Sequence, residues 1–155
     1  MSRSGFTTIE MIIVVILIGL ITMIGFPRMR AALQKSNVRS TRVALAGLTS
    51  IARAAAVQRG CRAAVHFRTG ASGVGRSWVT ACPRTKAGAG TVDTLGGVEQ
   101  LATRYSVTLT TTRDSVQFNP RGLNMDFLQT VVRVQGAIAE AKDSTVINQV
   151  GKVTR

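Results

Sequence analysis

The first strong pattern along the chain is an apolar run over residues 6–27, FTTIEMIIVVILIGLITMIGFP, which contains one acidic residue, Glu10. At about 1.5 Å per residue, a helix over this run spans roughly 31 Å, which matches the hydrocarbon core of a bilayer. A carboxylate inside such a span costs several kcal/mol unless it finds a partner. The pattern therefore predicts a transmembrane helix whose Glu10 meets another chain inside the membrane. The alternative is a Glu10 that snorkels to the membrane surface.

Beyond Pro27, apolar residues recur at steps of three and four, which predicts that residues 28–59 form an amphipathic stem helix. Its expected apolar face consists of Val38, Ala44, Leu45, Leu48, Ile51, Ala52 and Ala55, and a basic stripe consists of Lys35, Arg39, Arg42 and Arg53. We expect the apolar face to pack on a sheet and the helix to end at Arg59-Gly60, with Gly60 as a left-handed cap.

Residues 60–155 are predicted to form a β-rich head. Residues 61–67 (CRAAVHF) and 77–83 (SWVTACP) are typical of a hairpin around a Gly-rich loop. Further strands are predicted at 104–112, 114–122, 128–136 and 144–155, with a loop at 84–97 and a turn at 118–123 where Pro120 fixes φ and Gly122 takes a positive φ. The predicted fold class is α+β, a long N-terminal helix with a transmembrane half and an amphipathic half, packed on an antiparallel β-sheet head.

Two cysteines, Cys61 and Cys82, flank the predicted hairpin. A ladder that pairs them sets Ala63 opposite Thr80, Val65 opposite Trp78 and Phe67 opposite Arg76, which aligns a mostly apolar face. We expect these cysteines to form a disulfide if the domain lies outside the cytoplasm.

The chain carries one histidine, His66, and its two cysteines cannot complete a four-ligand zinc site. No spacing of serine, histidine and acidic residues suggests a catalytic triad. We therefore expect no metal, no other cofactor and no enzymatic activity, and we interpret His66 as a strand residue.

Charge is distributed unevenly over the 155 residues, whose formal net charge is +13. Between Glu10 and Asp93 there is no acidic residue, while twelve arginines and lysines fall in that span. From Asp93 onward, seven basic residues face six acidic ones. The one-signed span suits a polyanion such as nucleic acid or an anionic lipid surface, and its alternative is a solvated surface that confers solubility.

The start of the chain resembles the type III signal of type IV pilins and type II secretion pseudopilins. The matching residues are Gly5, Phe6, Thr7, Glu10 and Pro27. By this resemblance, residues 1–5 are a leader that prepilin peptidase removes between Gly5 and Phe6 on the cytoplasmic side, and the new amino group of Phe6 is methylated. The resemblance further implies that Glu10 pairs with the mature N-terminal ammonium of its own or a neighbouring subunit during filament assembly, which would offset the desolvation of both charges.

Two further segments are similar to the GspH/FimT group of minor pilins. Residues Phe118–Leu123 resemble an F-x-P-x-G turn of the head. The ending VGKVTR is similar to the Gly-Arg-x-Arg tail with which FimT-like pilins bind DNA: Gly151 matches, Lys152 replaces the first arginine, and Arg155 lies one residue beyond the second. The candidate contacts to double-stranded DNA are therefore Lys152 and Arg155 in the tail, or Arg39 and Arg42 in the stem; a frayed basic end is the alternative for the tail.

The resemblance implies a minor pilin of the type IV pilus, which assembles with other pilins and is anchored in the bacterial inner membrane by one span with a periplasmic head. A pseudopilin of the type II secretion system that does not bind DNA is the second hypothesis, and an enzyme on a membrane stalk is the third. The charges that flank the span, Arg3 before it and Arg28, Arg30 and Lys35 after it, favour the reverse orientation. We give the processing motif more weight because it is more specific.

Overall fold

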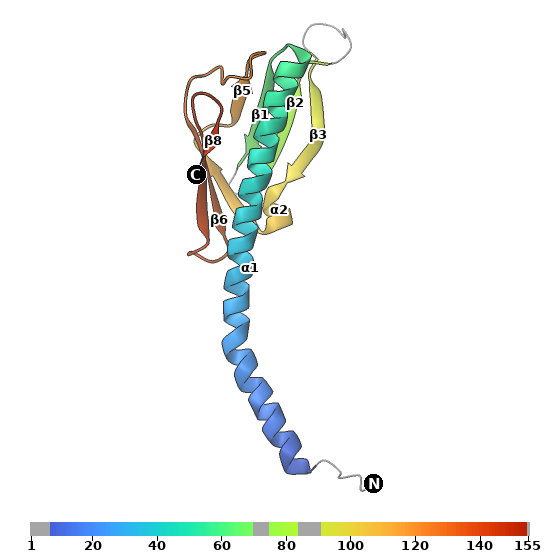
Figure 1. The fold of residues 1–155 in the computed structure, drawn as a ribbon, viewed down its shortest axis with the longest axis vertical. Helices are drawn as coiled ribbons and strands as arrows, with labels where there is room; N and C mark the ends of the chain where they lie inside the picture. Colours follow the sequence, from blue (N-terminus) through green and yellow to red (C-terminus); the bar gives the residue numbers. More distant parts are fainter. Residues whose placement is uncertain (1–6, 70–74, 84–90, 155) are drawn as a thin grey trace. The chain divides into compact units, whose positions relative to one another are not determined.

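One helix, α1 (Thr8–Arg59), forms the first third of the chain and continues through Pro27 (Figure 1). The structure is a computed structural model, and it describes residues 7–69, 75–83 and 91–154. By its internal contacts the chain divides into two units, Met1–Leu33 and Gln34–Arg155. The stem part of α1 therefore belongs to the same unit as the strands.

In the first unit, α1 is apolar on all sides. Its large side chains between Ile9 and Phe26 are exposed, and its most apolar 18-residue window has a mean hydropathy of 2.7 with none of it buried. This part of the helix is long enough and apolar enough to cross a membrane.

The second unit contains two four-stranded antiparallel sheets. The first has the strand order β3-β2-β1-β5 and the second the order β4-β6-β7-β8. Their strands are β1 (Ala63–Arg68), β2 (Arg76–Ala81), β3 (Asp93–Gln100), β4 (Val107–Thr111), β5 (Ser115–Phe118), β6 (Thr130–Gly136), β7 (Lys142–Ile147) and β8 (Val153–Thr154), and a short helix α2 (Leu101–Tyr105) joins β3 to β4.

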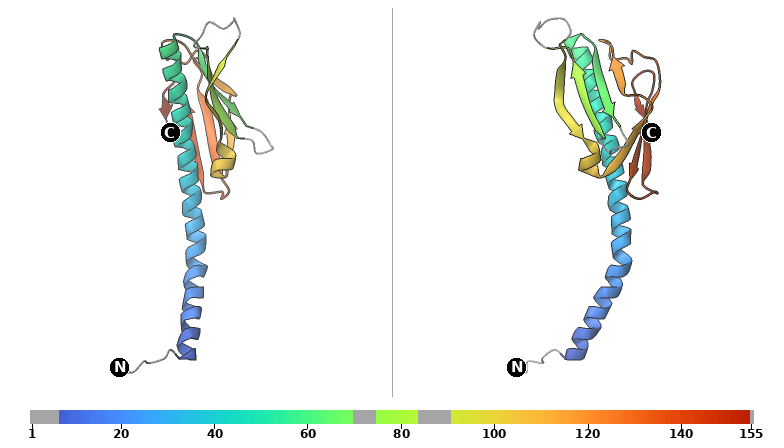
Figure 2. Two further views of the ribbon diagram at one scale, coloured as in Figure 1. Left: turned by 90° about the vertical axis from the view of Figure 1, so that its right-hand side faces the viewer. Right: turned by 180° about the vertical axis from the view of Figure 1, so that it is seen from behind.

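The core lies between the stem and the sheets, and most of the strands lie on one side of the helix (Figure 2). The stem contributes Val38, Leu45, Leu48, Ala52, Ala55 and Ala56, and the sheets contribute side chains such as Val65, Val79, Leu109, Phe118 and Val134. The predicted α+β fold, a long helix packed on an antiparallel head, is confirmed, and so is the helix end, because Gly60 has a φ of +62°.

The buried face of the stem differs from the predicted one at five positions: Thr41, Thr49 and Ala56 are buried without having been predicted, and Ala44 and Ile51 are not buried. Thr41 and Thr49 are fully buried, because each hydroxyl donates a hydrogen bond to the carbonyl four residues earlier (2.9 and 2.8 Å) and needs no other partner. Ile51 was predicted to be buried, but it is 46% exposed and lines an open pocket of about 600 Å³ with Leu95 and Pro83.

The predicted loop at 84–97 is wrong in its second half. Residues 84–90 lie outside the described residues, and Asp93–Gln100 form strand β3 on the edge of the first sheet. Most residues of this strand are exposed and Leu95 alone packs against the core, so the strand lacks the alternation by which a strand is recognised. It is held by its backbone pairing to β2. The strand predicted from residue 104 starts only at Val107, because Arg104 and Tyr105 belong to α2.

The predicted register of the hairpin is wrong by one residue. Ala63 pairs with Ala81, Val65 with Val79 and His66 with Trp78. The cysteines are not a directly opposed pair, because Cys61 lies in the turn that leaves the helix and β1 begins two residues later. A shift of one residue moves every side chain to the other face, so Trp78 and Thr80 point away from the core instead of lining it.

Candidate functional site

Glu10 lies in the first turn of α1, where its amide donates to the carbonyl of Thr7 (3.1 Å). It is exposed among apolar side chains. The N-terminal end of a helix carries a partial positive charge that favours a carboxylate there. Gly5 and Phe6, the predicted processing residues, lie outside the described residues.

Three of the four basic stem residues line a small polar cavity of about 260 Å³, whose full lining is Lys35, Val38, Arg39, Arg42, Glu140, Ala141, Lys142 and Asp143. Arg42 forms an ion pair with Asp143 of β7 (3.3 Å), and the Asp143 side chain is only 15% exposed. Arg39 is exposed on the same surface. The stem therefore offers Arg39 to an anion more readily than Arg42, whose charge is already compensated.

Lys152 lies beyond the other end of β7. The predicted strand at 144–155 is in fact two strands, because Asn148–Gly151 form a turn that returns the chain as β8. About five residues of extended chain, roughly 16 Å, separate Asp143 from Asn148. The stem and tail candidates are therefore not brought together, and Arg155 lies outside the described residues.

Two turns in the head have the same construction, and we call them the paired turns: Asn119–Leu123 and Asn148–Lys152. In each, the asparagine side-chain oxygen accepts hydrogen bonds from the amides two and four residues later, at 3.0 and 2.9 Å in the first turn and at 3.1 and 2.8 Å in the second. In each, the glycine amide donates to the asparagine carbonyl (2.8 and 2.9 Å). The predicted turn at 118–123 is confirmed, and the sequence did not predict its twin.

Both glycines of the paired turns have positive φ and lie against other parts of the head. A Cβ on Gly122 (φ +76°) would stand 3.1 Å from Arg53 and Val57 of the stem, and one on Gly151 (φ +82°) would stand 2.6 Å from the Phe118 ring. The paired turns thus lie next to each other, and their exposed cations Arg121 and Lys152 are on neighbouring loops with Arg53 beside the first.

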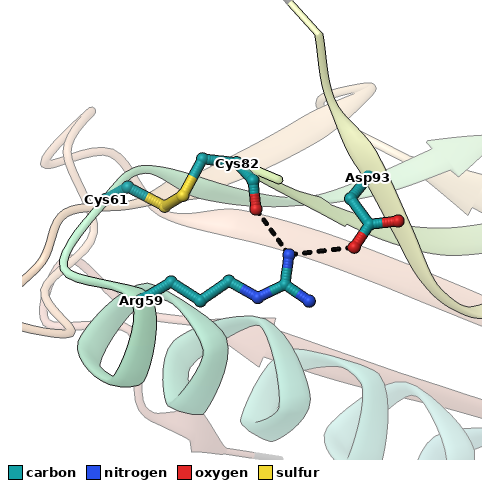
Figure 3. Close-up of a disulfide and its surroundings, with 4 residues drawn as sticks. All are labelled: Arg59, Cys61, Cys82 and Asp93. Carbon is teal, nitrogen blue, oxygen red and sulfur yellow. Dashed lines mark hydrogen bonds and ion pairs between the residues drawn. A yellow bond between two sulfur atoms is a disulfide. The ribbon is translucent and has the colours of Figure 1, made fainter. Parts of the chain in front are cut away.

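A disulfide joins Cys61 to Cys82, with a Cα–Cα distance of 6.3 Å. Arg59, the last residue of α1, donates a hydrogen bond to the carbonyl of Cys82 and pairs with Asp93 of β3 (3.0 Å) (Figure 3). The Arg59 side chain is 15% exposed, so its charge is held between the helix end and the edge of the first sheet. The disulfide and Arg59 together fasten the end of the stem to β2 and β3.

Sequence reasoning missed a pair of aromatic rings on the outer face of the first sheet. His66 stacks on Trp78 with 5.1 Å between ring centroids, and its Nε2 lies 2.8 Å from the hydroxyl of Thr80. Partial burial lowers the pKa of His66 from its ordinary value of 6.5, because the charged ring would lose hydration. Only the correct register could have revealed this pair, since the predicted register placed Trp78 opposite Val65.

Within the described ranges, no three histidine, cysteine or acidic side chains gather in a way that could hold a metal ion.

The comparisons with known proteins show the fold. Two crystal structures of the type IV minor pilin FimU of Pseudomonas aeruginosa strain PAO1, in two crystal forms, are similar to this chain. One has a TM-score of 0.58 at 12% sequence identity and covers 77% of this chain and 87% of FimU. The other has a TM-score of 0.53 at 12% identity and covers 75% of this chain and 90% of FimU. No protein-family model and no curated protein matches the chain.

Proposed function

We propose that the chain is a minor pilin of the type IV pilus, similar to the GspH/FimT group, which enters or primes a filament through its N-terminal helix. The observation that carries the proposal is the combination of an exposed apolar N-terminal part of α1, interrupted only by Glu10 near its start, with the fold of a minor pilin. Such a helix is unstable in water and needs lipid or other helices around it.

In this proposal, prepilin peptidase cleaves between Gly5 and Phe6, and the Phe6 amino group is methylated. The precursor spans the bacterial inner membrane once, with the head in the periplasm. Glu10 then pairs with the N-terminal ammonium of a neighbouring subunit, so both charges leave the membrane together. The disulfide between Cys61 and Cys82 supports this orientation, because disulfides persist outside the cytoplasm.

The test of the assembly role compares the wild-type chain with Glu10→Ala and Glu10→Gln in cells that produce pili. We expect both variants to be cleaved and to stay in the membrane fraction, but to fall at least about tenfold in the sheared filament fraction, because the partner ammonium is left unpaired. Thr22→Ala, which changes a polar residue of the same helix, is the matched control and is expected to assemble. An uncut chain that stays in the aqueous fraction would contradict the proposal.

We further propose that the head contacts double-stranded DNA through phosphates at the paired turns, where Lys152 and Arg121 lie on neighbouring loops and Arg53 lies beside Gly122. Phosphate contacts tolerate replacement of arginine by lysine better than base contacts do. The test is duplex DNA binding by the full chain in detergent micelles at increasing salt, where several phosphate contacts give a steep loss of affinity. Absence of binding at low salt would favour a type II secretion pseudopilin and leave the filament role standing.

A further inference from the structure

The outer face of the first sheet carries an aromatic pair at the edge of a cavity. His66 of β1 and Trp78 of β2 are cross-strand partners, and their rings lie within 16° of parallel. Both are only partly buried, and they line a cavity of about 740 Å³ together with side chains that include Arg62, Thr80 and Gln117. A half-exposed, hydrogen-bonded ring pair is a rigid stacking surface, since the contact with Thr80 restrains the imidazole.

Arginines lie at both ends of this face. Arg68 and Arg76 are directly opposed in the ladder at one end, and Arg62 lines the cavity at the other. All three share the outward side with His66 and Trp78, because side chains two residues apart in a strand point the same way. Like charges directly opposite each other destabilise a sheet, so this arrangement gains from a bound anion.

No carboxylate of the described residues in the first sheet compensates these arginines. Asp93 and Glu99 of β3 pair with Arg59 and Arg104. Asp114, which precedes β5, is exposed and forms no ion pair with these arginines among the described residues. The outer face therefore keeps its positive charge.

The edge strand β3 leaves space beside the indole. Its pairing with β2 shifts between Ser77 and Val79, opposite Trp78, and Gly96 and Gly97 fall in this bulge with φ of +72° and +83°. A Cβ on either glycine would meet no atom within 4 Å beyond its chain neighbours. His66 of β1 stacks on the indole, and the bulge lies opposite Trp78 in the strand on the other side of β2. Glycines within a strand mark bulges, tight bends or sites where a ligand approaches the backbone closely, and here the space beside them is open.

We propose that this face, which we name the aromatic platform (Arg62, His66, Arg68, Arg76 and Trp78), binds single-stranded nucleic acid. An unpaired base stacks on the indole of Trp78, and the flanking phosphates lie against the arginines, a combination that holds a strand without regard to its sequence. The arginines at the two ends are about six residues, or roughly 20 Å, apart, which is room for a few nucleotides.

The chemistry of the platform favours this ligand over other anions. An acidic peptide would use the arginines but not the rings, and a neutral saccharide would use the indole but not the arginines. A DNA duplex keeps its bases stacked inside the helix and cannot present one to a recessed ring. The platform is also separate from Lys152 and from the helix α1, so this inference does not depend on the proposed filament role or on duplex binding.

Trp78 is the only tryptophan of the chain, so its fluorescence reports binding at the platform directly. The experiment titrates the full chain in detergent micelles with a short oligo(dT) strand and records tryptophan fluorescence, together with the anisotropy of a labelled strand. We expect oligo(dT) to quench the tryptophan fluorescence, and we expect the quenching and the anisotropy to give the same binding curve. Trp78→Ala is expected to weaken oligo(dT) binding by about 5- to 150-fold, the range for one stacked base, and Trp78→Phe to restore part of it.

The arginines are tested by Arg68→Ala and Arg76→Ala, each of which should lower the salt dependence of oligo(dT) affinity by about one phosphate contact. Arg133→Ala, which removes the same charge from the outer face of the second sheet, is the matched control and should change the salt dependence of oligo(dT) affinity less. The proposal is overturned if Trp78→Ala is folded by circular dichroism and binds oligo(dT) like the wild type. Equal quenching by duplex DNA or by dextran sulfate would also overturn it, and none of these results would alter the outcome of the Glu10 test.

Discussion

The ring of Phe118 lies against the α-carbon of Gly151, so closely that a Cβ there would stand 2.6 Å from Cε1 of the ring. Phe118 is fully buried, so the ring has no room to retreat. This contact joins the first residue of the F-x-P-x-G turn to the glycine of the tail, the two segments whose sequences resembled GspH/FimT-type pilins. Gly151 therefore has a structural role in the head, whatever the tail binds.

We predict that Gly151→Ala destabilises the head strongly. The substitution places a side chain at positive φ, which costs about 1 to 2 kcal/mol, and forces it into the Phe118 ring, which costs about 1 to 3 kcal/mol more. Gly60→Ala is the matched control, because Gly60 has a φ of +62° but nothing within 4 Å of an added Cβ. Thermal unfolding followed by circular dichroism should show a larger loss for Gly151→Ala; equal losses would contradict the contact.

The disulfide between Cys61 and Cys82 should respond to reductant. It closes a loop of 21 residues in sequence separation, and closing a loop of that length stabilises a fold by about 3 kcal/mol. We expect the melting temperature of the full chain to fall when reductant is added. The double variant Cys61→Ser, Cys82→Ser should have the melting temperature of the reduced wild-type chain, with or without reductant. A wild-type melting temperature that does not change on addition of reductant would argue against a stabilising role of the disulfide.

The stability of the head should fall in mild acid because of His66. Burial lowers the pKa of His66 below 6.5, so below that pH the unfolded chain binds more protons than the folded one. This contribution is therefore fully present above about pH 6.5 and is lost as the pH falls through the folded-state pKa. Melting temperatures at about pH 7.5 and about pH 5 should differ more for the wild type than for His66→Gln, and an identical difference would show that His66 plays no part.

Measurements of duplex DNA binding should show whether the contact lies at the tail residue Lys152 or at the stem arginines Arg39 and Arg42. If the paired turns carry the contact, Lys152→Ala should lower the salt dependence of affinity by about one phosphate, while Arg39→Ala has a smaller effect. Arg42→Ala should have the smallest effect, because its ion pair with Asp143 already compensates the charge. A dominant loss from Arg42→Ala would instead move the interface to the stem.

The helix and the fold class could be predicted from the sequence because they rest on long, repeated patterns. The apolar run to Pro27 and the three- and four-residue steps of the stem extend over many turns, so errors at single positions such as Ile51 do not alter the result. The buried Thr41 and Thr49 could not be predicted from hydropathy, because their hydroxyls are satisfied within the helix itself.

The strand register could not be predicted, because it depended on one assumption about Cys61 and Cys82. Opposing the two cysteines directly shifts the ladder by one residue and sends Trp78 to the wrong face. The aromatic platform was hidden for that reason. The second of the paired turns was missed for a different reason. Asn148–Gly151 has no proline, and its flanking residues alternate well enough to continue a strand.

The bulge at Gly96 and Gly97 has one more consequence. An uninterrupted edge strand offers a row of backbone donors and acceptors on which another chain can add, and long exposed edges of this kind seed aggregation. The bulge breaks the ladder in the middle of β3, so neither half of this border is long enough to template a stable foreign strand. Crowded copies of the head can therefore lie side by side without fusing through β3.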